Sequence, residues 1–129
     1  MPETYRWFVG IDWATESHEV CVLDRERNIA GRRTIEHSGS GIAQLAEYLL
    51  KLCGHEPGQI AVAIGMPRGT IVETLVERQF AVYSLNPKQM DRFRDRHTVA
   101  GAKDDSRDAF VQAGALRTDL HLFHRVQTG

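Results

Sequence analysis

The chain has few cysteines and no excess of charge of either sign. Its 129 residues include 2 cysteines. Cys21 and Cys53 both stand among apolar residues, which favours reduced thiols in a folded core over a disulfide framework. The formal net charge is −1 and the sequence pI is near 6.6. No global basic field therefore predicts nucleic-acid binding, and any such contact must use a local patch.

Clustered zinc ligands and long apolar runs are missing as well. The 6 histidines are scattered, and the one close pair, His121 and His124, has no second pair of ligands near it. We interpret these two histidines as surface residues and predict no zinc site. No apolar run approaches the roughly 20 residues that span a bilayer, and the start MPETYRW lacks the apolar core of a signal peptide. We therefore expect a cytoplasmic protein with no membrane partner.

The composition that is present indicates one folded domain over residues 1–129. Hydrophobic residues make up 42% of the chain and charged residues 26%, which is ordinary for a globular protein with a buried core. Runs rich in β-branched and aromatic residues predict strands. The expected strands are 7–13, 18–24, 27–37, 59–65 and 80–86.

Helices are expected between and after the later strands. The first begins at a Ser40 cap and ends at Gly54. The second begins at a capping box from Thr70 to Glu73 and runs to Arg78. A third is expected over 86–96 and a fourth from 103 onward. The order βββαβαβαα predicts an α/β fold with a mixed five-stranded sheet flanked by helices.

The first strand, FVGIDW, has one unusual face. Alternation places Val9, Ile11 and Trp13 on one face and Gly10 and Asp12 on the other. An aspartate two residues after a glycine presents a carboxylate beside a position without a side chain, which leaves room for a ligand or a polymer backbone. The alternative is that Asp12 only begins a polar turn and Trp13 anchors the core. Both interpretations stay open for this strand alone.

The stretch KDDSRDA places three aspartates at the start of the last helix. Asp105 and Asp108 are three residues apart, so they share a helix face and could offer two hard oxygen ligands to one cation. The alternative is that these acids only cap the helix and offset its dipole. Together with Asp12, they give the set of distant acids that a metal-dependent phosphoryl-transfer site requires.

A local basic patch precedes this helix. Its cationic residues are Lys88, Arg92, Arg94, Arg96 and Lys103. Arginines in such a patch could bind phosphates without sequence preference. Interleaved aspartates fit a solvated helix face with ion pairs equally well, so both interpretations stay open.

Three segments carry a resemblance to a known family. VGIDWATESHEVCVLD, FAVYSLNPKQMDRFRDRH and AKDDSRDA resemble the N-terminal domain of the bacterial insertion-sequence transposases with the Asp-Glu-Asp-Asp tetrad, relatives of the Piv-type DNA invertases. The resemblance covers nearly the whole chain and implies a RuvC-like domain with a ribonuclease-H-like fold. The family pattern K-T-D-x-x-D-A closes this domain, and residues 103–109 fill it with Asp104 in place of the threonine.

The resemblance also implies which residues form the site. Three of the four family acids carry over, as Asp12, Asp105 and Asp108. The fourth is a glutamate at the end of the fourth strand, and the matching position here is Gly65. In the family reading, the acids hold Mg²⁺ and are catalytic. Because one acid is missing, we expect weak or absent Mg²⁺ binding and an impaired site in this chain.

The function that the resemblance implies is cleavage and transfer of DNA strands in transposition. It further implies a structured guide RNA as a partner and homo-oligomers of the full-length protein. The family's second domain, which supplies a serine nucleophile, has no counterpart in these residues. We therefore expect the RuvC-like domain alone.

Two other function classes are compatible with parts of the sequence. A non-catalytic remnant would bind nucleic acid or sister subunits without cleavage, and Gly65 favours this alternative. An actin-like sugar kinase is suggested by GIDWAT. It fits badly, because such enzymes need a second lobe and further glycine-rich phosphate loops.

Overall fold

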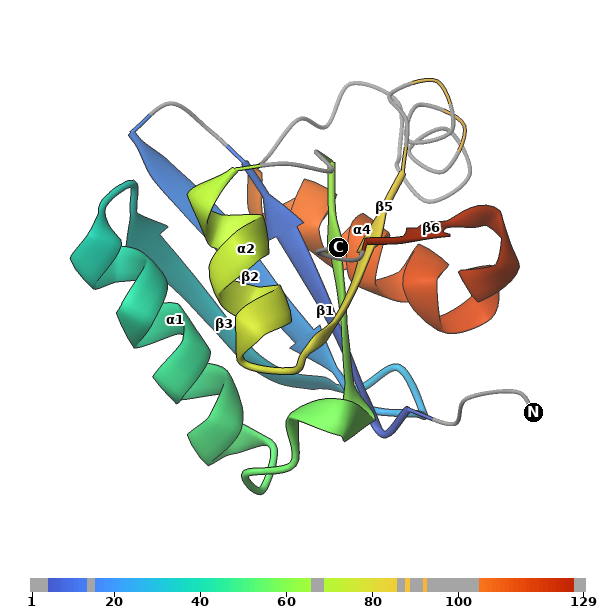
Figure 1. Ribbon diagram of the computed structural model, residues 1–129. Helices are drawn as coiled ribbons and strands as arrows, with labels where there is room; N and C mark the ends of the chain where they lie inside the picture. Colours follow the sequence, from blue (N-terminus) through green and yellow to red (C-terminus); the bar gives the residue numbers. More distant parts are fainter. Residues whose placement is uncertain are drawn as a thin grey trace.

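The structure is a computed structural model that describes residues 5–13, 16–65, 69–85, 88, 92 and 105–126, without the side chains of residues 105–108. In this part of the chain, one mixed sheet carries helices on both faces (Figure 1). The strands are β1 (Trp7–Asp12), β2 (Ser17–Leu23), β3 (Ile29–Glu36), β4 (Ile60–Ile64), β5 (Ala81–Ser84) and β6 (His124–Arg125). The helices are α1 (Gly39–Leu52), α2 (Thr70–Glu77) and α4 (Asp105–Thr118), with short 3-10 turns at Pro57–Gln59 and Leu120–Leu122.

The strand order within the described sheet is β3-β2-β1-β4-β5-β6. β1, β4 and β5 run parallel to one another, whereas β2, β3 and β6 pair antiparallel with their neighbours. The α/β class and the mixed sheet are confirmed, and the arrangement is consistent with a ribonuclease-H-like fold. All five expected strands are present. The sheet has a sixth strand, β6, whose two residues are too few to form a periodic pattern.

One face of the sheet is covered by α1 and α2. Alternate residues of β1, Val9 and Ile11, point into this layer and are fully buried. Ile42, Leu45 and Leu49 of α1 pack against them at helical spacing. This cluster consists mainly of large aliphatic side chains, as expected for a sheet face that lies under two helices.

The opposite face is covered by α4, and small residues form the centre of this contact, with larger side chains such as Phe8, Leu23 and Leu116 in the same cluster. Its strands contribute Ala61, Ala63 and Ala81, and α4 contributes Ala109, Ala113 and Ala115. At the centre lies Gly10, where an added Cβ would overlap the carbonyl oxygen of Ala109 and lie 2.7 Å from the amide nitrogen of Ala113. The backbones of β1 and α4 are therefore in direct contact.

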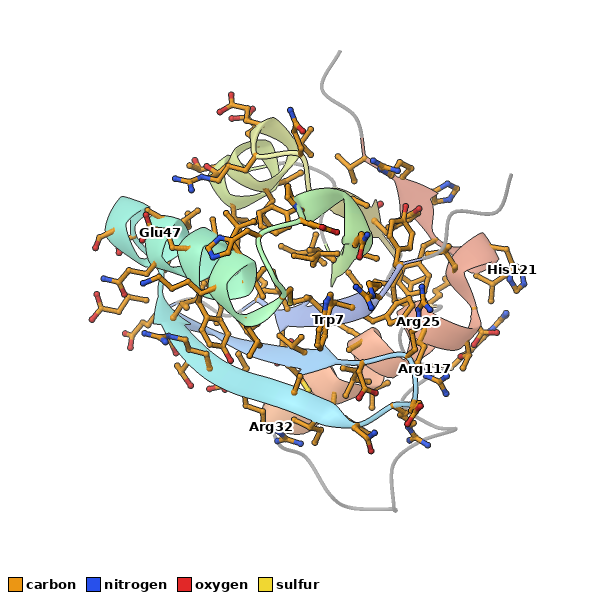
Figure 2. The ribbon with its side chains drawn as sticks, turned by 90° about the horizontal axis from the view of Figure 1, so that it is seen from below. Trp7, Arg25, Arg32, Glu47, Arg117 and His121 are labelled. Atoms are coloured by element: carbon orange, nitrogen blue, oxygen red, sulfur yellow. The ribbon has the colours of Figure 1, made fainter. Side chains whose placement is uncertain are left out.

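The direction of α4 follows from the contacts at its other end. Nη1 of Arg117, in the last turn, donates a 2.9 Å hydrogen bond to the carbonyl of Arg25 in the turn between β2 and β3. Figure 2 shows these two residues side by side. That turn lies beside the amino end of β1, because Phe8 pairs with Leu23. α4 therefore runs antiparallel to β1, and its first turn lies by the carboxyl end of that strand (Figure 1).

Two helix starts differ from the predicted ones. α1 is capped by Ser38, whose hydroxyl oxygen accepts a 3.0 Å hydrogen bond from the amide of Gly41, and not by Ser40. The earlier start is possible because Gly41 has no side chain where it lies against the carbonyl of Glu36.

The predicted capping box of α2 is also wrong. Thr70 is already the first helical residue, and the N-cap is Gly69, with a φ of 122° and no side-chain cap. A positive φ of this kind favours glycine, which explains the choice of residue. The predicted helix over 86–96 lies outside the described residues except for Lys88 and Arg92, which are helical and exposed.

Both cysteines are buried and free, as predicted. Burial raises the pKa of the Cys21 thiol, and it raises the pKa of the Cys53 thiol to about 12. Thiols with such raised pKa values stay protonated and unreactive at neutral pH. None of the helices in the described ranges is long and apolar enough to cross a membrane.

A buried histidine contacts an exposed one just before the start of α1. His18 of β2 is fully buried, and its Nε2 lies 3.1 Å from Nδ1 of His37. The ring of Trp13 stacks on that of His18 with centroids 3.6 Å apart. Burial, and secondarily the charge of His37, lowers the pKa of His18. The fold therefore favours the neutral form of His18.

The contact at Gly10 predicts an asymmetry between two glycine substitutions. Gly10→Ala should lower the free energy of unfolding by about 2 kcal/mol or more, since the new methyl group meets backbone that cannot move aside. Gly114→Ala is the control on α4, where nothing lies within 4 Å of the added Cβ. It should stabilise by roughly 0.5–1 kcal/mol through helix propensity. Urea unfolding of both variants measures this, and equal stability of the two would contradict the close approach.

The lowered pKa of His18 predicts a pH dependence with a definite sign. Its contribution to stability should be complete above pH 6.5, the pKa of an unperturbed histidine, and should be lost as the pH falls from there through the lowered folded pKa. The loss amounts to at most about 1.4 kcal/mol per pH unit in that window. His18→Phe should remove this slope, whereas substitution of the exposed His121 should not. An unchanged slope in His18→Phe would show that another group controls it.

Candidate active site

Three strands bring polar positions side by side at one edge of the sheet. Asp12 is the last residue of β1 and is half-buried. In the antiparallel pair it lies opposite Glu19 of β2. In the parallel pair Ile11 lies opposite Ile64 of β4, so Gly65, the next residue, is level with Asp12. Asp12 therefore stands between Glu19 and Gly65.

These positions belong to the face that α4 covers. Two positions further from this edge on the three strands stand Gly10, Cys21 and Ala63, and all three lie under α4. Since side chains alternate along a strand, Asp12 and Glu19 face the same side. A side chain at position 65 would follow the same alternation if the strand direction continued for one more residue.

The start of α4 lies over this edge. Ala109 rests on Gly10, and the helix runs toward the amino end of β1, so Asp108 and Asp105 precede the contact on the side of Asp12. With about 1.5 Å of rise per helical residue and about 3.3 Å per strand residue, these backbones reach the carboxyl edge of β1 together. The structure therefore gathers the segments that carry the three predicted acids.

The side chains of Asp105 and Asp108 lie outside the described residues. The convergence of their carboxylates with that of Asp12 therefore stays a prediction. Among the side chains that are described, no three histidine, cysteine or acidic residues form a group that could hold a metal ion.

Gly65 stands just beyond β4, which ends one residue sooner than predicted, at Ile64. Gly65 is exposed, an added Cβ would have nothing within 4 Å, and its φ is not among the positive values of the described glycines. Neither a close approach nor a left-handed backbone requires glycine there. The fold would accept a larger residue at this position.

The predicted room at Gly10 is occupied by the protein itself. The sequence suggested that a ligand or polymer backbone could approach this glycine. Instead, the backbone of α4 at Ala109 and Ala113 fills the space. Gly10 therefore brings the acidic helix to the strand, and the position at this edge where an added Cβ would meet nothing within 4 Å is Gly65.

One buried polar residue of α4 was not predicted. Gln112 is 6% exposed. With its amide nitrogen and oxygen assigned from their surroundings, the nitrogen faces the sheet and donates to the carbonyl of Ile11 at 2.9 Å and that of Ala63 at 3.3 Å. The sequence does contain a signal, since a glutamine interrupts the run AFVQAGAL one helical turn after Ala109. Polar residues on a buried face need partners.

Glu19 was also missed as a neighbour of the site. Its Oε1 accepts a 2.8 Å hydrogen bond from the hydroxyl of Thr34 on β3. The alternation of Glu19 with Cys21 in β2 was a usable signal, but its position opposite Asp12 depends on strand pairing.

The predicted nucleic-acid contacts lie almost entirely outside the described residues. Arg94, Arg96 and Lys103 are not described, whereas Arg92 is helical and its side chain is exposed. The basic patch therefore stays a prediction.

Comparison with known proteins identifies relatives of this chain. It is 52% identical over 124 residues to "Putative transposase y4uE" of Sinorhizobium fredii, a match that covers 95% of this chain and 34% of the relative. It is 36% identical over 118 residues to "Mini-circle putative transposase for IS117" of Streptomyces coelicolor, covering 92% of this chain and 28% of the relative. The chain thus spans about a third of the length of these relatives.

A family match extends over residues 9–129, to the DEDD transposases of IS110 type, described as Transposase. The match includes the strand with Asp12 and the whole of α4. It agrees with the resemblance carried by VGIDWATESHEVCVLD and AKDDSRDA. The chain therefore belongs to the IS110-type DEDD transposase family.

Proposed function

We propose that this chain is the RuvC-like, DNA-cleaving domain of an insertion-sequence transposase. The observation that carries the proposal is the meeting of three distant segments at one sheet edge. Asp12 ends β1, position 65 follows β4 at the same level, and the acidic start of α4 lies over Gly10 beside them. A site for metal-assisted cleavage of a phosphodiester needs such convergent acids.

The residue types at this edge suit magnesium. Mg²⁺ prefers carboxylate oxygens and keeps several waters, so it needs few protein ligands and an open side for a phosphate. Asp12, Asp105 and Asp108 would hold the ion, and the space beside Gly65 is open. When bound, the ion would stabilise the negative charge that develops on a phosphate as the strand is cut.

The chain's own elements prepare this edge in two ways. Asp12 is fixed at the end of a strand that pairs on both sides, which limits its movement. The amino end of α4 carries the positive end of the helix dipole, which favours ionised carboxylates and an approaching phosphate. Both effects act before any substrate binds.

DNA is the proposed substrate, and the remainder of the full-length protein completes the activity. The proposal includes a structured guide RNA and a homo-oligomer as partners, on the basis of the family resemblance. A serine nucleophile would come from a second domain, which fits the fact that the chain spans about a third of its relatives.

A second candidate function is favoured by Gly65. With three of the four family acids, the chain would hold Mg²⁺ poorly and would bind nucleic acid or sister subunits without cutting. The catalytic and non-catalytic candidates share the same fold and differ at this position. The side chain at position 65 therefore separates them.

Gly65→Glu tests both candidates. We expect it to raise Mg²⁺ affinity about 10-fold or more in calorimetry, since it returns a charge and two oxygen ligands to a position with open space. The melting temperature should then rise with Mg²⁺ concentration. Gly65→Gln is the matched control, because glutamine has the size of glutamate without its negative charge. Asp12→Asn in the Gly65→Glu chain should abolish the gain.

Two outcomes would contradict this assignment. If Gly65→Glu leaves Mg²⁺ affinity unchanged, position 65 is not the place of the fourth acid. If the unsubstituted chain already binds Mg²⁺ tightly, another acid completes the site, and Glu19, opposite Asp12, is the first to substitute.

Binding to DNA should depend on the arginines before α4. If Arg92, Arg94 and Arg96 each contact a phosphate, replacing all three with glutamine should reduce the slope of log affinity against log salt by about 2.7 for duplex DNA. Arg32, Arg33 and Arg78 are exposed arginines elsewhere on the surface and serve as a charge-matched control. An equal loss of slope in both triple variants would indicate a general charge effect.

A further inference from the structure

We infer that Gln112 is a positioning residue, which sets the place of the acidic start of α4 relative to Asp12. Its amide joins the helix to the two strands that end at the site. The inference rests on the proposed function, because only a metal site at this edge gives that alignment a chemical consequence.

The position of Gln112 would ordinarily suit an apolar residue. It is 6% exposed and shares its helix face with Ala109, Ala113 and Leu116, all fully buried. A buried amide without hydrogen bonds is unfavourable, whereas an apolar side chain of the same size would pack there at no such cost. The hydrogen bonds to the sheet therefore explain why a glutamine is compatible with this face.

The two acceptors identify what the amide holds. The carbonyl of Ile11 belongs to the peptide group that continues into Asp12, and it lies 2.9 Å from the amide nitrogen. The carbonyl of Ala63, at 3.3 Å, lies two residues before Gly65 on the neighbouring strand. A single side chain thus bonds to both strands close to the positions that would bind metal.

Gln112 adds to the packing at Gly10, where the backbones of Ala109 and Ala113 already lie against β1. Its hydrogen bonds to two strands supply a directional constraint along the helix axis that the alanine side chains beside it lack. A shift of one residue, about 1.5 Å, would move Asp105 and Asp108 past Asp12. Magnesium ligands require oxygen distances of about 2.0–2.1 Å in near-octahedral geometry, so a shift of this size would separate the ligands.

The far end of the helix is held separately. Arg117 bonds to the carbonyl of Arg25 beside the amino end of β1, about five residues further along α4 than Gln112. Figure 2 shows these two arginines side by side. Of these two hydrogen-bonding side chains of α4, Gln112 is therefore the one nearer to Asp105 and Asp108.

The test compares Gln112→Met with Leu116→Val, both introduced into the Gly65→Glu chain. Methionine keeps the length and volume of glutamine but has no donor. Leu116→Val loses packing one turn further along α4 and leaves the bonds to the sheet in place. Mn²⁺ and Mg²⁺ affinities are measured by calorimetry well below all melting transitions, and urea unfolding reports the stability of each variant.

We expect Gln112→Met to weaken metal binding about 10-fold or more, in the range known for groups that orient metal ligands. Leu116→Val should leave the affinity within about 2-fold of its parent, even where it costs the same stability. If both variants weaken metal binding in proportion to their loss of stability, or if Gln112→Met binds as tightly as its parent, the inference is overturned.

A metal-independent measurement separates this inference from the proposed function. Amide hydrogen exchange is recorded on the unsubstituted chain and on Gln112→Met without metal. We expect exchange to accelerate about 10-fold more over 109–113 than over 115–118, because the released end of α4 opens first. Uniform acceleration along α4 would overturn the positioning role, whereas a Gly65→Glu chain that binds no metal would overturn the proposed site alone.

Discussion

Direct contact between the backbones of β1 and α4 at Gly10 is the constraint on which the rest of this face depends. Because Gly10 has no side chain, Ala109 and Ala113 can approach the strand more closely than any Cβ would permit. The short distance then requires alanines on the neighbouring strands. It also brings the amide of Gln112 within hydrogen-bonding distance of the sheet. The same close approach of α4 to β1 places the first residues of α4 near Asp12 at the end of the strand.

The fold could be predicted from local sequence wherever a periodic pattern was long enough. Alternation in β1, β2 and β3 and the apolar run of β4 gave strands close to the observed bounds. Helix starts were less predictable because several polar residues could serve as caps. Ser38 and Ser40 are equivalent by residue type, and the contact of Gly41 with Glu36 decides between them. The two residues of β6 form a strand only because β5 offers an edge.

The residues predicted for the candidate site stand in local sequence patterns, whereas their structural neighbours do not. Asp12 stood out because it follows a glycine by two residues in a predicted strand. Asp105 and Asp108 stood out because they share one face at the start of a predicted helix. The positions of Glu19 and Gln112 depend on which strand pairs with which and on how the helix is oriented, and no local sequence pattern contains either. Gly10 shows the same limit, since its empty position was recognised but its occupant comes from a segment about a hundred residues away.

The packing of α4 on β1 also determines when the edge can form during synthesis. β1 is made first and α4 last among the helices described, so the ribosome must release nearly the whole domain before Ala109 reaches Gly10. Contacts that span so much of the chain form late in folding. Domains also tend to fold as units once they have emerged. A nascent chain that stops before α4 thus contains Asp12 without Asp105 and Asp108, so an incomplete product would lack two of the three predicted acids.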